Sequence, residues 1–266
     1  MTQITDIQEL RDIQMGILDE IHRFCTSRDI RYFLSSGSLL GAVRHGGYIP
    51  WDDDLDIYMP RTDYERFLDE WDCGVRNGDD DEAYEVINPA TAEHYFYTFA
   101  KVVDTRTLMV EKATEGYEIG VYVDVFPVDY VPDDEAERER VFKRKKLLYK
   151  IRQCKLSRHC CLKSRVAYWC YKHLPLSLSR LNKMIEELVV RREPTGWMCN
   201  MTEAGPGVKS CLPAELLSDW VDIRFEDRTY KTMVGFKEYL SLTYGDYMTL
   251  PPVEQRQTHQ FEAYKL

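Results

Sequence analysis

The sequence predicts an α+β fold in which a mixed sheet is flanked by helices. Three observations predict it. Apolar residues recur at helical spacing near the N-terminus, short strand-like runs occupy the next hundred residues, and a long basic helical segment precedes a hairpin. This order of helix, sheet, helical block, hairpin and helix is typical of α+β proteins.

The elements follow from periodicity and from turn residues. Helices are expected at 4–28, 38–44, 61–71 and 235–244, across most of 132–194, and after Pro251-Pro252. Strands are expected at 31–34, 55–59, 84–87, 96–103, 107–111 and 120–126. The segment 224–233 resembles a hairpin that turns at Glu226 and Asp227.

Composition narrows the class of protein. The chain has 266 residues, of which 44% are apolar and 30% charged, as in globular proteins. It has eight cysteines and no C-x-x-C pair, so free thiols in a reducing cytoplasm are expected. The start, "MTQITDIQEL", does not resemble a secretory signal, and no apolar run reaches the roughly 18 residues that span a bilayer.

Charge is distributed unevenly along the chain. Residues 138–192 contain 17 Lys or Arg and three acids, a net +14, whereas the remaining 18 basic and 42 acidic residues give −24. This asymmetry predicts an anionic partner for the basic segment. An anionic membrane surface or a lipid-linked acceptor is favoured, the alternative is a solvated helical face, and nucleic acid is not expected. We therefore predict a catalytic core at 1–133 and 200–266 with a basic helical insertion at 134–199.

Four aspartates stand within five positions in "WDDDLDIYM". Because side chains alternate along a strand, Asp54, Asp56 and Tyr58 should share one face while Leu55, Ile57 and Met59 pack on the core. Two adjacent carboxylates suit Mg²⁺ or Mn²⁺. A calcium loop does not fit, since Ile57 and Asp63 stand where that loop needs glycine and usually glutamate. For Asp52 and Asp53 alone, a solvated turn is the favoured interpretation.

A later strand and a glycine turn extend the predicted site. In "GVYVDVFPVD", Asp124 is an acid on an otherwise apolar strand, and it would be costly to bury without a partner. We predict that it joins Asp54 and Asp56 around the metal. Gly37 and Ser38 lie between a strand and a helix, where backbone N–H groups can bind phosphate. Lys101 and Arg44 are candidate phosphate contacts, although a strand-edge lysine in solvent is nearly as good an interpretation of Lys101.

These residues resemble the LicD family of phosphocholine transferases, relatives of fukutin within the nucleotidyltransferase superfamily. The resemblance lies in "SGSLLGAVRHGGYIPWDDDLDIYMPRTDYERF" and in "KVVDTRTLMVE", "GVYVDVFPVD" and "LTYGDYMTLPP", which occur in the family's order. It covers roughly residues 5–130 and 222–266. The resemblance implies a nucleotidyltransferase-like core and transfer of phosphocholine, or a related alcohol phosphate, from a CDP-activated donor. The implied acceptor is a sugar hydroxyl of a cell-surface glycan precursor, such as teichoic acid or lipopolysaccharide.

The resemblance also assigns residues. Gly37 and Ser38 match the family's phosphate-binding pair, Asp54 and Asp56 its metal-binding pair, and Asp124 its third acid. A choline headgroup would need aromatic faces, for which Trp51 and Tyr58 are candidates beside Tyr48, Tyr122 and Phe126. Two alternatives remain open: a nucleotidyltransferase that moves NMP and releases pyrophosphate, and an inactive binding protein of the same fold. A cytoplasmic location with peripheral contact to the inner face of the cell membrane is expected.

Overall fold

The computed structural model describes residues 1–73, 83–92, 95–111, 117–157, 161–202, 205, 207–256 and 262–266. Its helices are α1 (Ile7–Arg28), α2 (Ser36–His45), α3 (Arg61–Cys73), α4 (Glu135–Leu156), α5 (Arg165–Lys172), α6 (Leu178–Val189) and α7 (Phe236–Tyr244). The main strands are β3 (Asp56–Pro60), β4 (Tyr84–Ile87), β5 (Ala100–Glu111), β6 (Tyr117–Val131), β9 (Trp220–Phe225) and β10 (Arg228–Met233). Shorter strands are β1 (Thr2–Ile4), β2 (Phe33–Leu34), β7 (Trp197–Asn200), β8 (Leu212–Pro213) and β11 (Ala263–Lys265).

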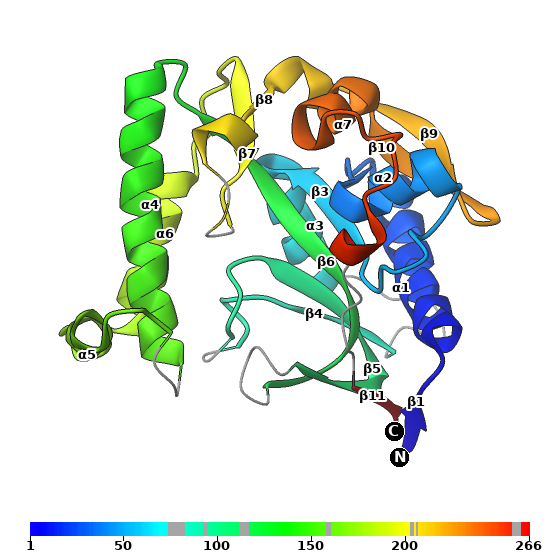
Figure 1. Ribbon diagram of the computed structural model, residues 1–266, viewed down its shortest axis with the longest axis horizontal. Helices are drawn as coiled ribbons and strands as arrows, with labels where there is room; N and C mark the ends of the chain where they lie inside the picture. Colours follow the sequence, from blue (N-terminus) through cyan, green and yellow to red (C-terminus); the bar gives the residue numbers. More distant parts are fainter. Residues whose placement is uncertain are drawn as a thin grey trace.

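One mixed sheet organises the fold, as predicted for an α+β chain (Figure 1). Within the described residues it has nine strands, with the main order β1-β11-β5-β6-β3-β2. Strand β4 also pairs with β5, and β7 and β8 extend the sheet from β6. Strands β3 and β6 run parallel, and the other pairs are antiparallel. The hairpin of β9 and β10 forms a separate two-stranded sheet.

Most predicted elements are confirmed, with differences at their ends. The first helix starts at Ile7 rather than at residue 4, because residues 2–4 pair with β11 as an edge strand. The strands predicted at 96–103 and 107–111 are one strand, β5, whose register shifts between Asp104 and Met109. The helix predicted after Pro252 is wrong. The described part of that tail contains a short 3₁₀ turn at Val253–Gln255 and strand β11.

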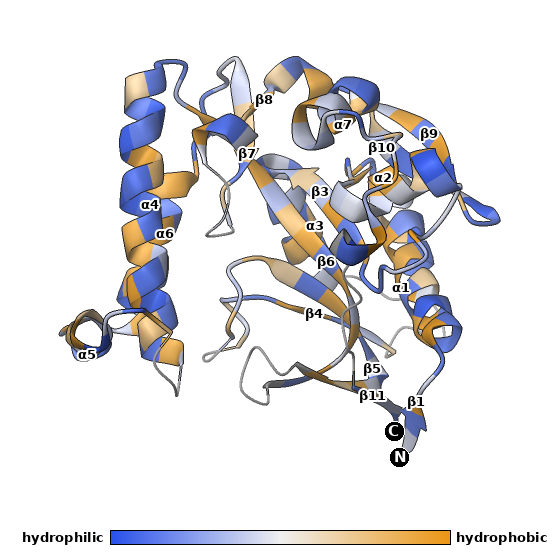
Figure 2. Ribbon diagram, viewed as in Figure 1, coloured by the Kyte–Doolittle hydropathy of each residue, from blue (hydrophilic) through white to orange (hydrophobic). Residues whose placement is uncertain are grey.

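Two groups of buried side chains stabilise the fold, and their apolar stripes are visible in Figure 2. The larger group joins α1 and the apolar face of the sheet, with Ile57, Val123 and Val125 fully buried. The smaller group holds α4 and α6 against the sheet and includes Phe142, Leu181 and Val131 of β6. The basic helical block therefore packs directly on β6 and β7 through its own apolar face.

The basic block is less exposed than its composition predicts. Arg138, Lys145 and Arg152 of α4 are buried, and Lys145 has no exposed surface. The Lys145 ammonium lies over the rings of Phe142 and Tyr149, 4.9 and 5.9 Å from their centroids. Part of the +14 charge is therefore internal, while Lys143, Arg144 and Lys146 of α4 and Arg180 and Lys183 of α6 present charge to solvent.

Candidate active site

Asp56 and Asp124 occupy directly opposed positions on the parallel strands β3 and β6. The backbone N–H of Asp124 donates to the carbonyl of Leu55, which ties β6 to the residue between Asp54 and Asp56. All three predicted carboxylates line one cavity of about 330 Å³. We call it the carboxylate cavity. The alternation in the sequence thus places the three acids on one side of the sheet, because the apolar residues beside them are buried on the opposite face.

Helix α1 fixes the acidic loop that leads into β3. Arg11 donates from Nη2 to the carbonyl oxygens of Ile49 and Asp52, at 2.9 and 2.7 Å, and Gln14 donates from Nε2 to the carbonyl of Asp53 at 2.8 Å. Asp53 is 5% exposed, which contradicts a solvated turn for this residue. The loop is therefore part of the packed structure, and it holds Asp54 at the mouth of β3.

The predicted phosphate-binding pair lies in the first turn of α2, at the expected junction of strand and helix. The hydroxyl of Ser38 accepts a hydrogen bond from the N–H of Asp56 at 2.8 Å, so it fixes the start of β3. Gly37 stands against the acidic loop, because a Cβ on this residue would lie 2.6 Å from Oδ2 of Asp52. The absence of a side chain here allows the loop to approach the helix, whose first N–H groups have no intrahelical partner.

Lys101 is buried beside Asp124 rather than exposed at a strand edge. The two residues are cross-strand neighbours on β5 and β6, and Lys101 Nζ lies 2.5 Å from Asp124 Oδ1. The ammonium also stands 3.3 Å from the ring centroid of Tyr122 and 4.3 Å from that of Tyr97. Lys101 is only 1% exposed, so the structure makes it a partner of Asp124 and not part of the cavity wall.

Aromatic side chains also line the carboxylate cavity. They are Phe96, Tyr97, Phe99, Phe126 and Tyr149. The rings of Phe99 and Phe126 pack at 4.2 Å between centroids, and those of Tyr97 and Phe99 at 5.0 Å. Of these five residues, only Phe126 is a candidate from the sequence. The run "YFYTF" at 95–99 is the signal for Phe96, Tyr97 and Phe99, but its pattern predicts an ordinary strand.

Helix α4 of the basic block also lines the carboxylate cavity, through Tyr149, Arg152 and Gln153. Arg152 donates from Nη2 to the carbonyls of Tyr95 and Tyr97, at 2.7 and 3.0 Å, which holds the aromatic segment in place. Burial lowers the pKa of Arg152 to about 10 and raises that of Tyr149 to about 12. The helical block therefore contributes to the site, although its basic composition predicts an insertion outside the catalytic core.

Three further candidates lie outside the walls of the carboxylate cavity. Tyr58 is buried edge-to-face against Phe126 and Tyr239, so it supports the aromatic wall from behind. Trp51 packs under the guanidinium of Arg256, which lies 4.6 Å from its ring centroid. Arg44 donates from Nη1 to the carbonyl of Tyr247 at 2.9 Å, and burial lowers the pKa of its guanidinium.

Helix α7 contacts the start of α2, beside the predicted phosphate-binding pair. The hydroxyl of Tyr239 on α7 accepts a hydrogen bond from the N–H of Ser36 at 3.0 Å. Partial burial raises the pKa of Tyr244, and the charges of Asp56, Asp52 and Asp54 raise it further. Asp246 accepts from the hydroxyl of Thr249 at 2.6 Å, so it stabilises the turn after α7.

The carboxylates of the cavity are of the ligand type that Mg²⁺ takes. In the described part of the chain, no three His, Cys, Asp or Glu side chains are arranged as a complete metal site. Mg²⁺ does not require one, because it usually takes one or two carboxylates, keeps several waters and completes its shell with substrate phosphate. Asp54, Asp56 and Asp124 on one cavity wall provide such a partial ligand set.

Comparison with known proteins supports a common origin for this arrangement. A family model described as LicD/FKTN/FKRP, nucleotidyltransferase domain, matches residues 29–160. The match includes both acidic strands and α4, so the boundary predicted at residue 134 falls inside it.

Individual relatives show the same likeness. The chain is 31% identical to the lipopolysaccharide cholinephosphotransferase LicD of Haemophilus influenzae, over 98% of both chains. It is 64% identical to the ribitol 5-phosphate transferase FKRP of Homo sapiens over 28 residues, which are 10% of this chain and 6% of that protein. It is also 47% identical to the uncharacterized protein RT0683 of Rickettsia typhi over 51 residues, or 19% of this chain and 16% of that protein. The identity across the whole of the first relative, together with the family model, shows that this chain belongs to the LicD family.

Proposed function

We propose that this protein transfers phosphocholine, or a related alcohol phosphate, from a CDP-activated donor to a sugar hydroxyl of a cell-surface glycan precursor. As a member of the LicD family the chain is a phosphotransferase. The observation that carries the finer proposal is the carboxylate cavity. It combines three aspartates with a wall of aromatic rings, which suits a substrate that has both a phosphate and a cationic headgroup.

Asp54, Asp56 and Asp124 would hold Mg²⁺ or Mn²⁺ together with the donor diphosphate. When bound, such an ion neutralises negative charge on the phosphates and on the CMP leaving group. The other contribution of the protein is to hold these carboxylates in place. Ser38 fixes the start of β3, and Lys101 holds the Asp124 carboxylate by a charge-assisted hydrogen bond. Positioning of this kind is the main contribution that phosphoryl transfer requires from a protein.

The aromatic wall is the proposed site for the choline headgroup. A quaternary ammonium has no N–H to donate, so it is recognised by the faces of aromatic rings. Phe96, Tyr97, Phe99 and Phe126 lie on the same cavity as the carboxylates, which also attract a cation. This assignment replaces Trp51 and Tyr58, since neither residue lines the carboxylate cavity.

The proposed reaction is a single displacement at phosphorus. The oxygen of the sugar hydroxyl forms a bond to the phosphorus of the phosphocholine group, and the bond from that phosphorus to the bridging oxygen breaks. CMP leaves with the electron pair, and the hydroxyl proton passes to a carboxylate. Asp124 is the proposed acceptor because it lines the cavity from the central strand β6.

The reaction products separate this proposal from its alternatives. Purified protein would be incubated with CDP-choline, Mg²⁺ and a lipopolysaccharide or teichoic-acid precursor. We expect release of CMP, phosphocholine on the glycan, and loss of activity with EDTA. Asp56→Asn should lower turnover at least about 100-fold, while Asp227→Asn, at the 86% exposed tip of the hairpin, should have no effect. Pyrophosphate release would support nucleotidyl transfer, and no product with any acceptor would support an inactive protein.

We also propose peripheral contact with an anionic membrane through the outer side of the helical block. The described residues contain no helix of the length and apolarity that crossing a bilayer requires. Helix α4 exposes Lys143, Arg144, Lys146 and Lys150, and α5 exposes Trp169, which is 64% exposed. Basic residues beside an exposed aromatic suit an anionic surface, at about 1 kcal/mol for each well-placed charge. A lipid-linked acceptor would be presented at such a surface.

A further inference from the structure

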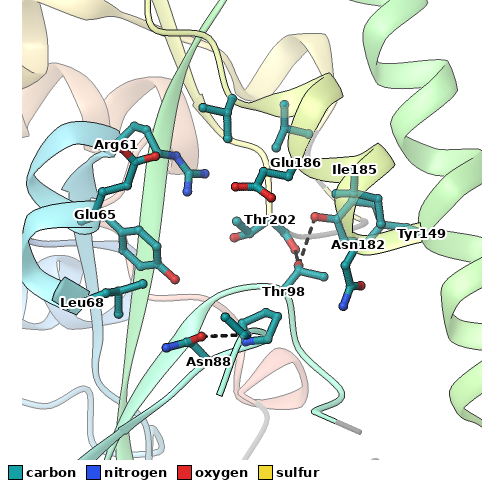
Figure 3. A pocket seen from close by; sticks show the side chains of 15 residues that line it. Arg61, Glu65, Leu68, Asn88, Thr98, Tyr149, Asn182, Ile185, Glu186 and Thr202 are labelled. Atoms are coloured by element: carbon teal, nitrogen blue, oxygen red, sulfur yellow. Dashed lines mark hydrogen bonds between the residues drawn. The ribbon is translucent and has the colours of Figure 1, made fainter. Parts of the chain in front are cut away.

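Residues of α3 and α6 line a second pocket, which is shown in Figure 3. We call it the α3–α6 pocket, and its volume is about 200 Å³. Thr98, Tyr149 and Thr202 line both hollows, so they form a shared wall between them. A group bound in the α3–α6 pocket would therefore lie directly beside the proposed site of transfer.

The shared wall is built from uncharged oxygen atoms. The hydroxyl oxygens of Thr98 and Tyr149 are 3.0 Å apart, as drawn in Figure 3. Tyr149 also donates to the carbonyl of Met201 at 3.0 Å, and the Thr98 hydroxyl contacts the carbonyl of Thr202. Such oxygen atoms suit a sugar. A protein hydroxyl can donate to a sugar hydroxyl or accept from it, and a carbonyl oxygen can accept from it.

The charges of the α3–α6 pocket disfavour a phosphate. Among its described lining residues, Arg61 is the only cation. Arg61 is already bound in bidentate fashion to buried Asp129, with both N···O distances 2.7 Å. Two carboxylates also line the pocket: Glu65 is paired with Arg192 at 2.8 and 3.2 Å, whereas Glu186 points toward the centre of the pocket in Figure 3. A neutral group with hydroxyls to donate would be attracted here, and a phosphate would be repelled.

The remaining lining suits a saccharide ring. Asn182 accepts from Arg152 Nε at 2.8 Å through Oδ1, so its Nδ2 is the donor end. Leu68, Ile185 and Val189 provide aliphatic surface for the C–H face of such a ring. The volume is below the roughly 300–1,000 Å³ of pockets for drug-sized ligands, which favours one sugar ring over a nucleotide.

We propose that the α3–α6 pocket binds a neutral pyranose residue of the acceptor glycan and presents its hydroxyl across the shared wall to the carboxylate cavity. This inference rests on the proposed transfer to a sugar. It adds the location of the acceptor and the residues that select it, chiefly Glu186 and Asn182 of α6. Helix α6 therefore contributes acceptor specificity, although it lies in the basic block rather than beside the acidic strands.

Direct binding tests this location without requiring turnover. Saturation-transfer NMR would be recorded with a panel of methyl pyranosides and, separately, with CMP. We expect at least one pyranoside to bind the wild type at millimolar concentration. Glu186→Gln and Asn182→Ala should each weaken that binding about tenfold, because the first replaces a charged hydrogen-bond acceptor with a neutral one and the second removes a donor to the sugar. Glu187→Gln is the matched control, since Glu187 is exposed on the same helix and does not line the pocket.

The outcomes separate the pocket from the reaction. Pyranoside binding that depends on Glu186 while no transfer occurs would retain the pocket and refute the proposed function. Transfer with unchanged acceptor KM in Glu186→Gln and Asn182→Ala would refute the pocket and retain the function. Weaker CMP binding in these variants, with pyranoside binding unchanged, would identify a nucleoside pocket instead. Absence of binding by every pyranoside at millimolar concentration would also overturn the inference.

Discussion

Lys101 and Asp124 form a buried ion pair in the centre of the sheet, with Nζ 2.5 Å from Oδ1 and the two side chains 1% and 14% exposed. Lys101→Met should leave the Asp124 carboxylate without this partner and destabilise the protein by about 3–5 kcal/mol. The change is measured by urea unfolding of metal-free protein.

The double variant Lys101→Met/Asp124→Asn is the matching control. It removes the charge that the single variant leaves unpaired, so it should recover much of the lost stability. A loss of stability in the double variant equal to the sum of the losses in Lys101→Met and Asp124→Asn would show that the pair is not coupled. Lys101→Met and the double variant should both lack transferase activity, because each disturbs the Asp124 carboxylate.

A side chain at Gly37 should affect turnover more than stability. A Cβ at residue 37 would meet Oδ2 of Asp52 at 2.6 Å, whereas a Cβ at Gly207 would meet nothing within 4 Å. The Asp52 carboxylate is the end of a flexible side chain, so Gly37→Ala should alter stability by less than about 1 kcal/mol. It should nevertheless lower turnover roughly ten- to a hundredfold, because it displaces the acidic loop and obstructs approach to the helix.

The Gly37 assay compares Gly37→Ala with Gly207→Ala. Turnover of CDP-choline and thermal unfolding would be measured for both variants. Gly207→Ala should retain wild-type turnover. Equal turnover in the two variants would show that close approach at Gly37 has no part in the reaction.

The ion pair of Arg61 and Asp129 should be important for stability. Asp129 is fully buried, and Arg61 binds it through two hydrogen bonds of 2.7 Å. Asp129→Asn should destabilise the protein by about 3–5 kcal/mol, because it leaves the Arg61 cation largely buried without its partner. Glu139→Gln breaks an exposed pair with Lys143 and should cost less than about 1 kcal/mol. Urea unfolding checks both values, and similar losses would contradict the argument from burial.

Membrane contact should depend on the exposed charges of α4. Replacing Lys143, Arg144 and Lys146 with Gln should reduce co-sedimentation with vesicles that contain anionic lipid. Binding of the wild type should weaken steeply with salt, because the Debye length is only about 8 Å at physiological ionic strength. Lys145 is left unchanged because it is buried. Trp169→Ala should weaken binding further, since this side chain is exposed on α5.

The control for membrane contact has the same change in net charge at another site. Lys209, Arg224 and Lys237 are exposed outside the helical block, and their replacement with Gln should leave vesicle binding nearly unchanged. Equal losses in the two triple variants would indicate a response to net charge alone. No vesicle binding by the wild type at low salt would refute membrane contact.

The sequence by itself determined the α+β class, most of the elements and the two acidic strands. These features depend on local patterns: the helical spacing in α1, the glycines after α2, and the alternation of buried and cavity-lining residues in the acidic strands. It buries Ile57, Val123 and Val125, while Asp56, Asp124 and Phe126 line the cavity. Side-chain direction in a strand follows from a period of two, so the common orientation of Asp54 and Asp56 was predictable before their partners were known.

Only the tertiary structure decided which strands are neighbours and what completes the cavity. The opposition of Asp56 to Asp124 and of Lys101 to Asp124 depends on β-sheet register between residues far apart in the chain. The position of Tyr149 and Arg152 depends on how α4 packs against the sheet, through apolar contacts that the basic composition concealed. Charge and composition describe a segment as a whole, whereas burial is assigned residue by residue through packing, and this is why Lys145 is internal while its neighbours face solvent.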